Sequence, residues 1–244
     1  MSTLIHRVVL QNDAHFGRKL PLHHLGVFLA ELPLAIRAAV SMAFRNRSQV
    51  KGRRPDWLER STDVRFVDHQ GNGESVLYFE APALGEAARE MYEQPTLAPE
   101  FDDRPAREDT AFDLLGDVLA DVQQRNGDSA RFDPALLDRI THFGRVFKKG
   151  PYREVDFTSR RFPKEAPARI NPALIESAKD LLGKTPLLQR VRIVGTLDGF
   201  MASTQRFFLV LDSGERIVGV FNDNHHEVMP NLWKQRILIS GMVI

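Results

Sequence analysis

The chain has no cysteine, which excludes disulfide bonds, thiolate metal ligands and a cysteine nucleophile. It also has no excess of one charge, since 33 lysines and arginines stand against 32 aspartates and glutamates. Attraction to nucleic acid would therefore come from local patches and not from the field of the whole protein. No run approaches the about 18 uninterrupted apolar residues of a membrane span. We expect a cytoplasmic protein that needs no cofactor and does not contact a membrane.

Known catalytic motifs are missing as well. The sequence contains no nucleophile elbow, no phosphate-binding glycine loop and no two-histidine zinc helix. Two groups of acids and imidazoles keep a metal-dependent enzyme open as an alternative: Asp63, Asp68 and Glu80 beside a predicted hairpin, and Asp223, His225, His226 and Glu227 in a predicted loop. Hairpin carboxylates usually stay in water, and adjacent histidines do not easily point the same way. We therefore expect no metal at either place.

The first 150 residues predict a helix-rich α+β domain. Alternating apolar residues predict a strand over 4–10, and apolar residues spaced by three or four predict a helix over 22–44. Pro33 lies inside this helical pattern, where it removes a backbone hydrogen bond and crowds the preceding turn. We expect either a kink there or two helices that meet near Glu31.

A hairpin and two more helices complete this domain. The hairpin is predicted over 63–80, because two β-rich runs flank glycines that supply the positive φ of a tight loop. Apolar spacing predicts a helix over 112–122, and Asp133 followed by Pro134 is typical of a capped helix start. Together with the strands, these helices define the α+β class.

The second domain is predicted over 151–244 and ends in a small antiparallel β-barrel. It begins with a strand around Val155 and a helix after Asn171, although both elements could instead belong to the first domain. A hairpin turn is predicted over 212–215 and a helical turn over 228–233. The predicted barrel strands are 191–197, 207–211, 216–221 and 236–244.

These barrel strands are apolar on both faces, which is more than a small barrel needs to fill itself. One face, suited to the interior, holds Val191, Ile193, Leu197, Leu209, Leu211, Ile217, Phe221, Ile237, Ile239 and Val243. The opposite face holds Val194, Phe208, Val210, Val218, Val220, Leu238, Met242 and Ile244. Burying one such side chain is worth about 1.5–3 kcal/mol, so all eight are not expected in water. Either the N-terminal part or a second chain must cover this face.

Basic residues concentrate in one stretch before the hairpin: Arg45, Arg47, Lys51, Arg53, Arg54 and Arg60, with Trp57 among them. A solvent-facing patch of this kind neutralises phosphates and stacks a base, whereas arginines at a helix end also suit the negative end of the helix dipole. A second basic cluster contains Lys148, Lys149, Arg153, Arg160, Arg161 and Lys164, and the barrel adds Arg190, Arg192 and Arg206. Nucleic-acid binding is thus an alternative function.

Two resemblances add to these patterns. The segments 190–198 (RVRIVGTLD), 207–214 (FFLVLDSG) and 236–241 (RILISG) resemble the small barrels of OB or SH3-like type that are appended to many bacterial proteins. The segments 52–58 (GRRPDWL) and 81–87 (APALGEA) are similar to uncharacterised bacterial proteins associated with defence or toxin–antitoxin loci. The second resemblance implies an accessory or antitoxin-like component.

Our main hypothesis is a non-enzymatic binding protein that engages a protein partner, or a second copy of itself, through apolar surface. The predicted interface contains Phe208, Val210, Val218, Val220, Leu238 and Met242. The alternatives are an OB-like nucleic-acid binder that uses the basic patch around residues 45–60 and a metal-dependent enzyme.

Overall fold

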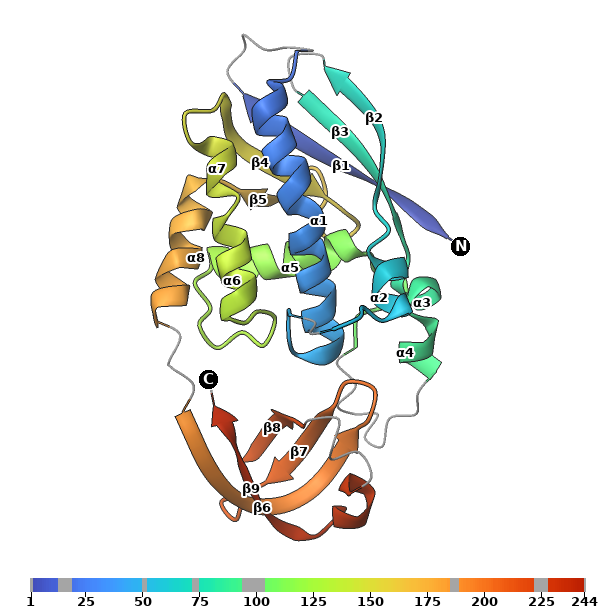
Figure 1. The fold of residues 1–244 in the computed structure, drawn as a ribbon, viewed down its shortest axis with the longest axis vertical. Helices are drawn as coiled ribbons and strands as arrows, with labels where there is room; N and C mark the ends of the chain where they lie inside the picture. Colours follow the sequence, from blue (N-terminus) through green and yellow to red (C-terminus); the bar gives the residue numbers. More distant parts are fainter. Residues whose placement is uncertain are drawn as a thin grey trace.

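The structure is a computed structural model that describes residues 2–12, 19–49, 52–71, 75–93, 104–184, 189–221 and 228–243. Two antiparallel sheets organise these residues, a larger one in the upper part of Figure 1 and a smaller one below it. The helices accompany the larger sheet. The protein therefore has the α+β fold that the sequence predicts.

Each sheet joins strands that are distant in the sequence. The first sheet has the spatial order β2 (Arg65–Gly71), β3 (Ser75–Pro82), β1 (Thr3–Asn12), β4 (Tyr152–Thr158) and β5 (Ala168–Ile170). The second has the order β8 (Arg216–Val220), β7 (Arg206–Val210), β6 (Gln189–Met201) and β9 (Arg236–Val243). The helices are α1 (Leu22–Arg45), α2 (Asp56–Ser61), α3 (Leu84–Ala87), α4 (Arg89–Glu93), α5 (Ala111–Gln123), α6 (Pro134–Thr141), α7 (Gly144–Phe147) and α8 (Pro172–Lys184), and a 3-10 turn, η3, covers Met229–Leu232.

Local sequence signals locate most of these elements correctly. The first strand, the hairpin strands, α5 and the turn η3 all lie where the residue patterns predict them. Asp133 caps α6, because its Oδ1 accepts a hydrogen bond from the backbone N–H of Leu136 at 2.8 Å. The same carboxylate accepts from the backbone and the hydroxyl of Ser48, which ties the chain after α1 to the start of α6. α1 continues through Pro33 as one helix, so of the two alternatives that the sequence leaves open, two separate helices are excluded.

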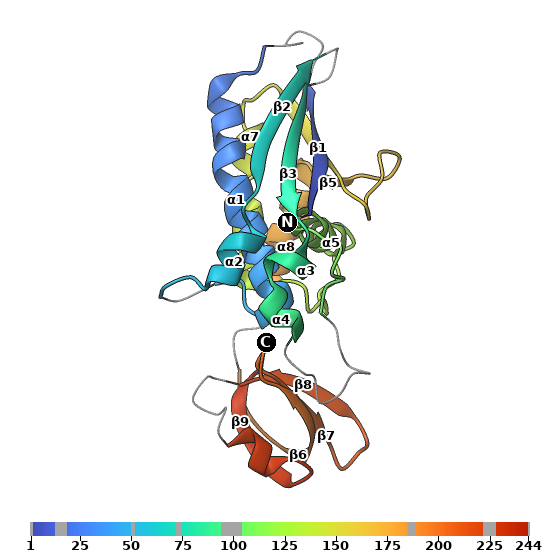
Figure 2. The same cartoon turned by 90° about the vertical axis from the view of Figure 1, so that its right-hand side faces the viewer.

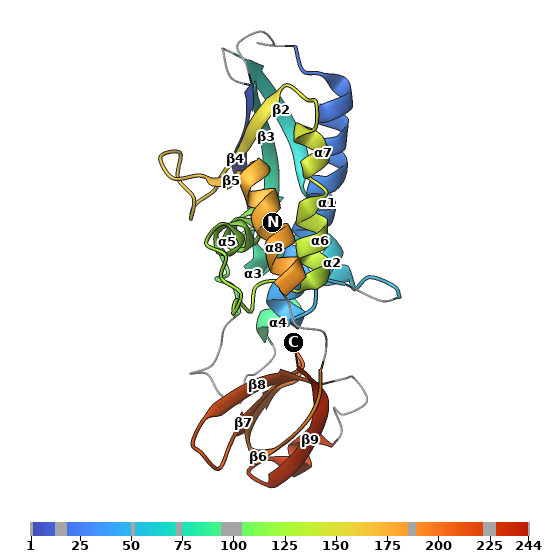
Figure 3. The ribbon, with the colours of Figure 1, turned by 90° about the vertical axis from the view of Figure 1, so that its left-hand side faces the viewer.

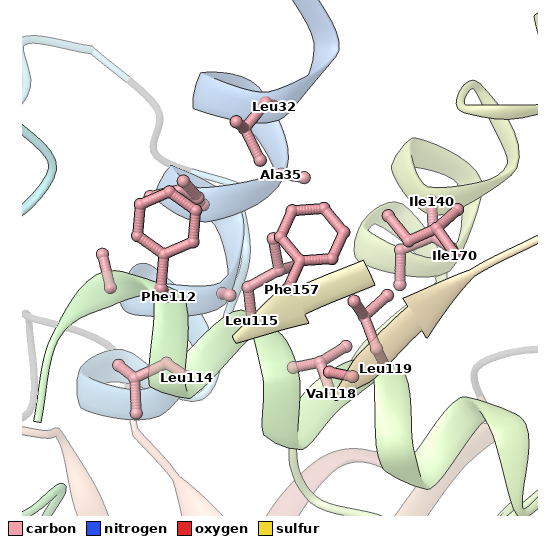
Figure 4. Packing of buried hydrophobic residues seen from close by; sticks show 14 of the residues in the cluster. Leu32, Ala35, Phe112, Leu114, Leu115, Val118, Leu119, Ile140, Phe157 and Ile170 are labelled. Atoms are coloured by element: carbon pink, nitrogen blue, oxygen red, sulfur yellow. The ribbon is translucent and has the colours of Figure 1, made fainter. Parts of the chain in front are cut away.

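The main core lies between the first sheet and the helices that cover one of its faces. Phe112, Leu115 and Leu119 project from α5 toward α1 and toward β4 and β5, as Figure 4 shows. Phe157 of β4 and Leu32 of α1 meet them in this layer and are almost completely buried. The apolar periodicity of α1 and α5 thus serves the protein's own core.

The segment from β4 to α8 packs with this first sheet. β4 pairs antiparallel with β1, which places Val155 opposite Leu10 and Phe157 opposite Val8. α8 packs against α5 and α6, and Figure 3 shows it beside α6 in the helical layer. A boundary at residue 150 would separate β4 from the strand to which it is hydrogen-bonded. The prediction assigns the strand around Val155 and the helix after Asn171 to the second domain, with the first domain as the alternative. The structure corrects this assignment, because both elements pack with the first sheet and its helices.

The second sheet curls below the helical layer, as Figures 2 and 3 show. β6 has 13 residues and pairs with both β7 and β9, with an irregularity between Leu197 and Gly199 where it pairs with β7. Gly195 permits close packing here, because a Cβ atom at this position would lie 2.6 Å from the backbone oxygen of Val210. Among the described residues β8 and β9 remain the two edges, and no pairing between them closes the sheet into a barrel.

α1 passes a simple test for membrane spans. By length and composition alone it is apolar enough to cross a membrane, with a mean hydropathy of 1.7 over an 18-residue window. Of that window, 56 % is buried inside the protein, which is equally what a core helix of a globular protein shows. The expectation from uninterrupted apolar runs did not single out this helix, because charged residues such as Glu31 and Arg37 interrupt it.

Candidate functional site

The outer face of the second sheet is the side opposite its own small core. That core contains Leu197, Leu209 and Phe221, together with Phe207 and Met229. Strand register places the predicted interface residues on the other side: Val194 lies opposite Leu238, Phe208 opposite Val218, and Arg206 opposite Val220. Val210 continues the row along β7. The alternation seen in the sequence is therefore present in the sheet.

Much of this outer face is open to solvent. Leu238 is 61 % exposed, Val218 57 %, Val220 44 % and Val194 42 %, and Val210 is half-buried. Met242 belongs to β9, but its side chain and residue Ile244 lie outside the described part of the chain. Isolated exposed valines are common on protein surfaces, whereas here Val194 and Leu238 are cross-strand neighbours, and Val218 and Val220 are successive on the same face of β8. The apolar surplus predicted from the sequence is thus a real surface.

One end of the outer face is covered by the N-terminal part of the protein. Arg206 and Phe208, successive on this face of β7, are each only 7 % exposed. Arg206 donates a hydrogen bond through Nη2 to Oδ1 of Asn46, the residue that ends α1. Arg47 donates to Oε1 of Gln205 at 3.2 Å, which adds a second link at the same junction. The prediction that Phe208 belongs to an exposed interface is therefore wrong, because the junction with α1 already buries this part of the face.

Arginines surround the exposed part of the patch. Register places Arg192, Arg216 and Arg236 on the outer face, and all three are exposed. Arg236 forms an ion pair with Asp212, and Arg216 Nη2 lies 3.8 Å from Asp198 Oδ2. Screening in solvent makes such pairs weak, so these guanidinium groups can exchange partners readily. A surface that docks here would combine an apolar centre with acidic groups around it.

The predicted basic patch is only partly available. Arg53 and Arg54 are exposed, and Lys51 lies outside the described residues. Arg45 is half-buried with its guanidinium 5.5 Å from the centre of the Trp57 ring, and Arg47 is held by Gln205. The basic stretch thus divides into groups engaged at the end of α1, Arg60 of α2, which pairs with Glu90, and two solvated arginines.

Trp57 corrects the expectation of a stacking surface. Its side chain is 5 % exposed and belongs to the main core. Its ring packs edge-on against Phe44, with 5.4 Å between the ring centres. A base has no open face of this ring to stack on. The sequence could not show this, because an aromatic residue among arginines is equally compatible with a solvent-facing and a buried position.

A metal centre finds no support in the described residues. Within the ranges that the structure describes, no group of three or more histidine, aspartate and glutamate side chains could hold an ion. Of the hairpin carboxylates, Asp63 pairs with Arg65 and Glu80 accepts a hydrogen bond from Thr3. The other predicted group, Asp223, His225, His226 and Glu227, lies outside the described residues.

Sequence reasoning missed a buried polar network at the start of α5. His6 on β1 is 2 % exposed, and its Nε2 lies 3.0 Å from the hydroxyl of Thr110. Asp113 accepts hydrogen bonds from the backbone and the hydroxyl of Thr110, which forms a capping box. The only signal in the sequence is Thr110 followed three residues later by an acid. A buried threonine without access to solvent suits a structural role better than catalysis.

Arg161 connects this network to the surface. Its guanidinium pairs with Asp109, which is 1 % exposed, and with Asp117 one helical turn beyond Asp113. Burial raises the pKa of Asp109 and of Asp117, while Arg161 opposes that rise. The sequence assigns Arg161 to the second basic cluster, and the structure shows that two aspartates hold its guanidinium.

The two sheets, the apolar outer face and the buried network define the protein as an α+β molecule with a candidate protein-binding surface. The chain matches no protein-family model, and no curated protein or solved structure matches it. The physical features of the surface are therefore what indicates the function.

The buried network predicts a specific pH dependence of stability. Burial lowers the pKa of His6 below the ordinary value of 6.5, although Asp113 opposes this. Below pH 6.5 the unfolded chain therefore binds a proton that the folded protein does not, and the free energy of unfolding falls until the lowered pKa is reached. In urea titrations between about pH 5 and pH 8, wild type is expected to lose stability toward acid more steeply than His6→Gln.

If the free energy of unfolding fell by the same amount toward acid in wild type and in His6→Gln, the prediction would be wrong. Asp113 does not obscure the comparison, because burial raises its pKa but hydrogen bonds from Ser159 and Thr110 outweigh that effect and lower it. Asp113 contributes its full stabilisation above pH 3.8, the ordinary pKa of an aspartate. This stabilisation is lost only as the pH falls through the lowered pKa of Asp113, which is below the measured range.

Proposed function

We propose that this protein is a non-enzymatic, cytoplasmic binding component whose second sheet docks a separate protein. The exposed apolar outer face carries the proposal: Leu238, Val218, Val220 and Val194 lie on one face and are each more than two-fifths exposed. Apolar side chains grouped in this way on a protein surface are typical of an interaction site. The small curled sheet, which we propose to be barrel-like in solution, presents them on its convex side.

The chemistry of this face favours one kind of partner. Arg192, Arg216 and Arg236 lie beside the apolar residues on the outer face. A protein segment with apolar side chains in the middle and aspartate or glutamate around them would complement both features, because electrostatic complementarity steers association and apolar burial holds it. An accessory or antitoxin-like role fits such a component.

A photo-crosslinking experiment tests this proposal. A benzophenone amino acid replaces Val218 in one sample and Leu22, which is 81 % exposed but on the first part of the chain, in the control. We expect irradiation in host extract to give a discrete protein adduct at position 218 that is absent at position 22. The crosslinked segment of the partner should be apolar with acidic flanks.

Matched charge variants separate docking from folding. With the benzophenone kept at position 218, Val220→Asp combined with Leu238→Asp is expected to remove the adduct without changing the thermal unfolding midpoint, because both side chains are exposed. Leu22→Asp should leave the adduct intact. An adduct that forms only with nucleic acid, or one that survives the double substitution, would contradict the proposal. An adduct to a second copy of this chain would replace the separate partner with self-association.

A further inference from the structure

One edge of the first sheet is formed by β2, which is hydrogen-bonded to β3 on one side only. In Figures 1 and 2 no helix or strand of the described part of the chain lies on its other side. Residues 65–68 of this strand are all exposed, Phe66 to 56 % and Val67 to 53 %. Such an edge presents unpaired backbone N–H and C=O groups, which can bond to another strand.

The pairing of β2 with β3 puts two opposite charges of β2 on the same face. Arg65 lies opposite Glu80, and Asp68 lies opposite Tyr78, two residues before Glu80. Residues two apart on a strand share a face, so Arg65 and Asp68 lie on the face that Tyr78 and Glu80 define. In a regular strand, residues three apart would face opposite ways. The extra residue Val67, which has no partner on β3, causes the exception.

The resulting strand is complementary to a second copy of itself. In an antiparallel pair related by a twofold axis, Arg65 of each copy lies opposite Asp68 of the other when Phe66 lies opposite Val67. A bulge on an edge strand usually discourages pairing, because one strand then has a residue more than its neighbour. Here both strands carry the same extra residue, so two residues stand opposite two and the register is kept.

Both charged groups are held only weakly within one copy. Arg65 pairs with Asp63 at 2.6 Å, but the side chain of Arg65 is 68 % exposed and that of Asp63 is 52 % exposed. Solvent makes such an ion pair weak, so exchange to another carboxylate costs little. Asp68 accepts a hydrogen bond through Oδ1 from the backbone N–H of His69 at 2.7 Å. An ionised carboxylate has two oxygens and accepts further hydrogen bonds, so Asp68 can also bind a guanidinium group.

We propose that two copies of this chain associate by antiparallel pairing of their β2 strands. The backbone groups of the two edges bond to each other, and Phe66 of each copy packs against Val67 of the other. The ion pair between Arg65 and Asp68 forms twice, because the axis repeats it. The two first sheets then form one continuous sheet with twice the five strands of a single copy. This interface is separate from the outer face of the second sheet, so the dimer carries two docking surfaces.

Sedimentation velocity of the full chain over a range of concentrations tests the proposal. A short strand edge buries less surface than a standard interface, so we expect a reversible dimer with a Kd of about 10–100 µM. Arg65→Asp and Asp68→Arg each put like charges opposite one another twice, and each is expected to weaken the dimer about tenfold or more. The double variant Arg65→Asp/Asp68→Arg restores opposite charges and should dimerise as wild type does. A wild-type chain that stays monomeric at about 500 µM would overturn the proposal.

An equimolar mixture of the two single variants separates pairing from folding. In a mixed dimer one chain carries acids at positions 65 and 68 and the other carries arginines at both, so every opposed pair attracts. The mixture is therefore expected to dimerise more tightly than either single variant alone, a recovery that damage to folding cannot produce. A mixture that associates no better than its components would overturn the register.

A variant of the outer face distinguishes this interface from the docking surface of the second sheet. Val220→Asp combined with Leu238→Asp changes two exposed residues of that outer face and should leave the dimer intact. Loss of the dimer in this variant would assign self-association to the outer face and would overturn pairing through β2. The crosslink at position 218 tests the docking function independently, because position 218 does not belong to β2.

Discussion

Trp57→Ala is expected to lower the free energy of unfolding by about 3–5 kcal/mol, the range measured for large aromatic side chains removed from cores. The reason is its position: the indole is 5 % exposed and packs from α2 against Phe44 near the end of α1. Phe44, its edge-on neighbour, is completely buried and also contacts Tyr92. The cavity left by alanine would therefore open beside rigid aromatic rings that cannot collapse into it.

Trp233 offers a matched control in the same chain. It is 48 % exposed, and its ring lies 4.8 Å from the ammonium group of Lys234. Trp233→Ala is expected to cost about 1 kcal/mol or less, the scale of an exposed cation–π contact. Chemical denaturation followed by circular dichroism measures both variants. Equal stability losses, or a Trp57→Ala protein that keeps its stability but loses binding to single-stranded nucleic acid, would restore the interpretation of Trp57 as a stacking residue.

Local signals in the sequence were sufficient for most of the fold. The Asp133–Pro134 cap and the period of α5 each depend on interactions within a few residues, and such interactions are written in the sequence itself. The continuity of α1 through Pro33 was not predictable in this way. Tertiary packing of Leu32 and Ile36, both buried, holds the helix together on either side of the proline.

Long-range contacts explain what the sequence left open about the site. The outer face could be predicted from alternation, since residues two apart must share a face. The sequence could not predict which residues of this face are covered, because this depends on where the end of α1 meets β7. Phe208 is buried there, while Val218, its cross-strand neighbour, stays exposed. A cavity of about 500 Å³ has the same origin, because its wall is drawn from segments between residue 39 and residue 206.

The second large effect is expected at Arg161. Arg161→Met removes the cation that faces Asp109, whose carboxylate is 1 % exposed, and leaves a buried charge with the backbone N–H of Ala106 as a hydrogen-bond donor. Fully buried pairs broken in this way cost about 3–5 kcal/mol. We expect a smaller loss of about 2–3 kcal/mol, because the side chain of Arg161 keeps 35 % of its exposure and solvent screens part of the interaction.

The preceding residue provides the control for this substitution. Arg160 pairs with Glu108, one position before Asp109, but both side chains are more than half exposed, so Arg160→Met should leave the unfolding midpoint nearly unchanged. The pH dependence adds a second test. Burial already raises the pKa of Asp109, and loss of Arg161 raises it further, so the folded variant takes up a proton that the unfolded chain still lacks. The stability deficit of Arg161→Met must therefore shrink as the pH falls from neutral. A deficit that is constant with pH would show that packing, and not the buried charge, is what Arg161 supplies.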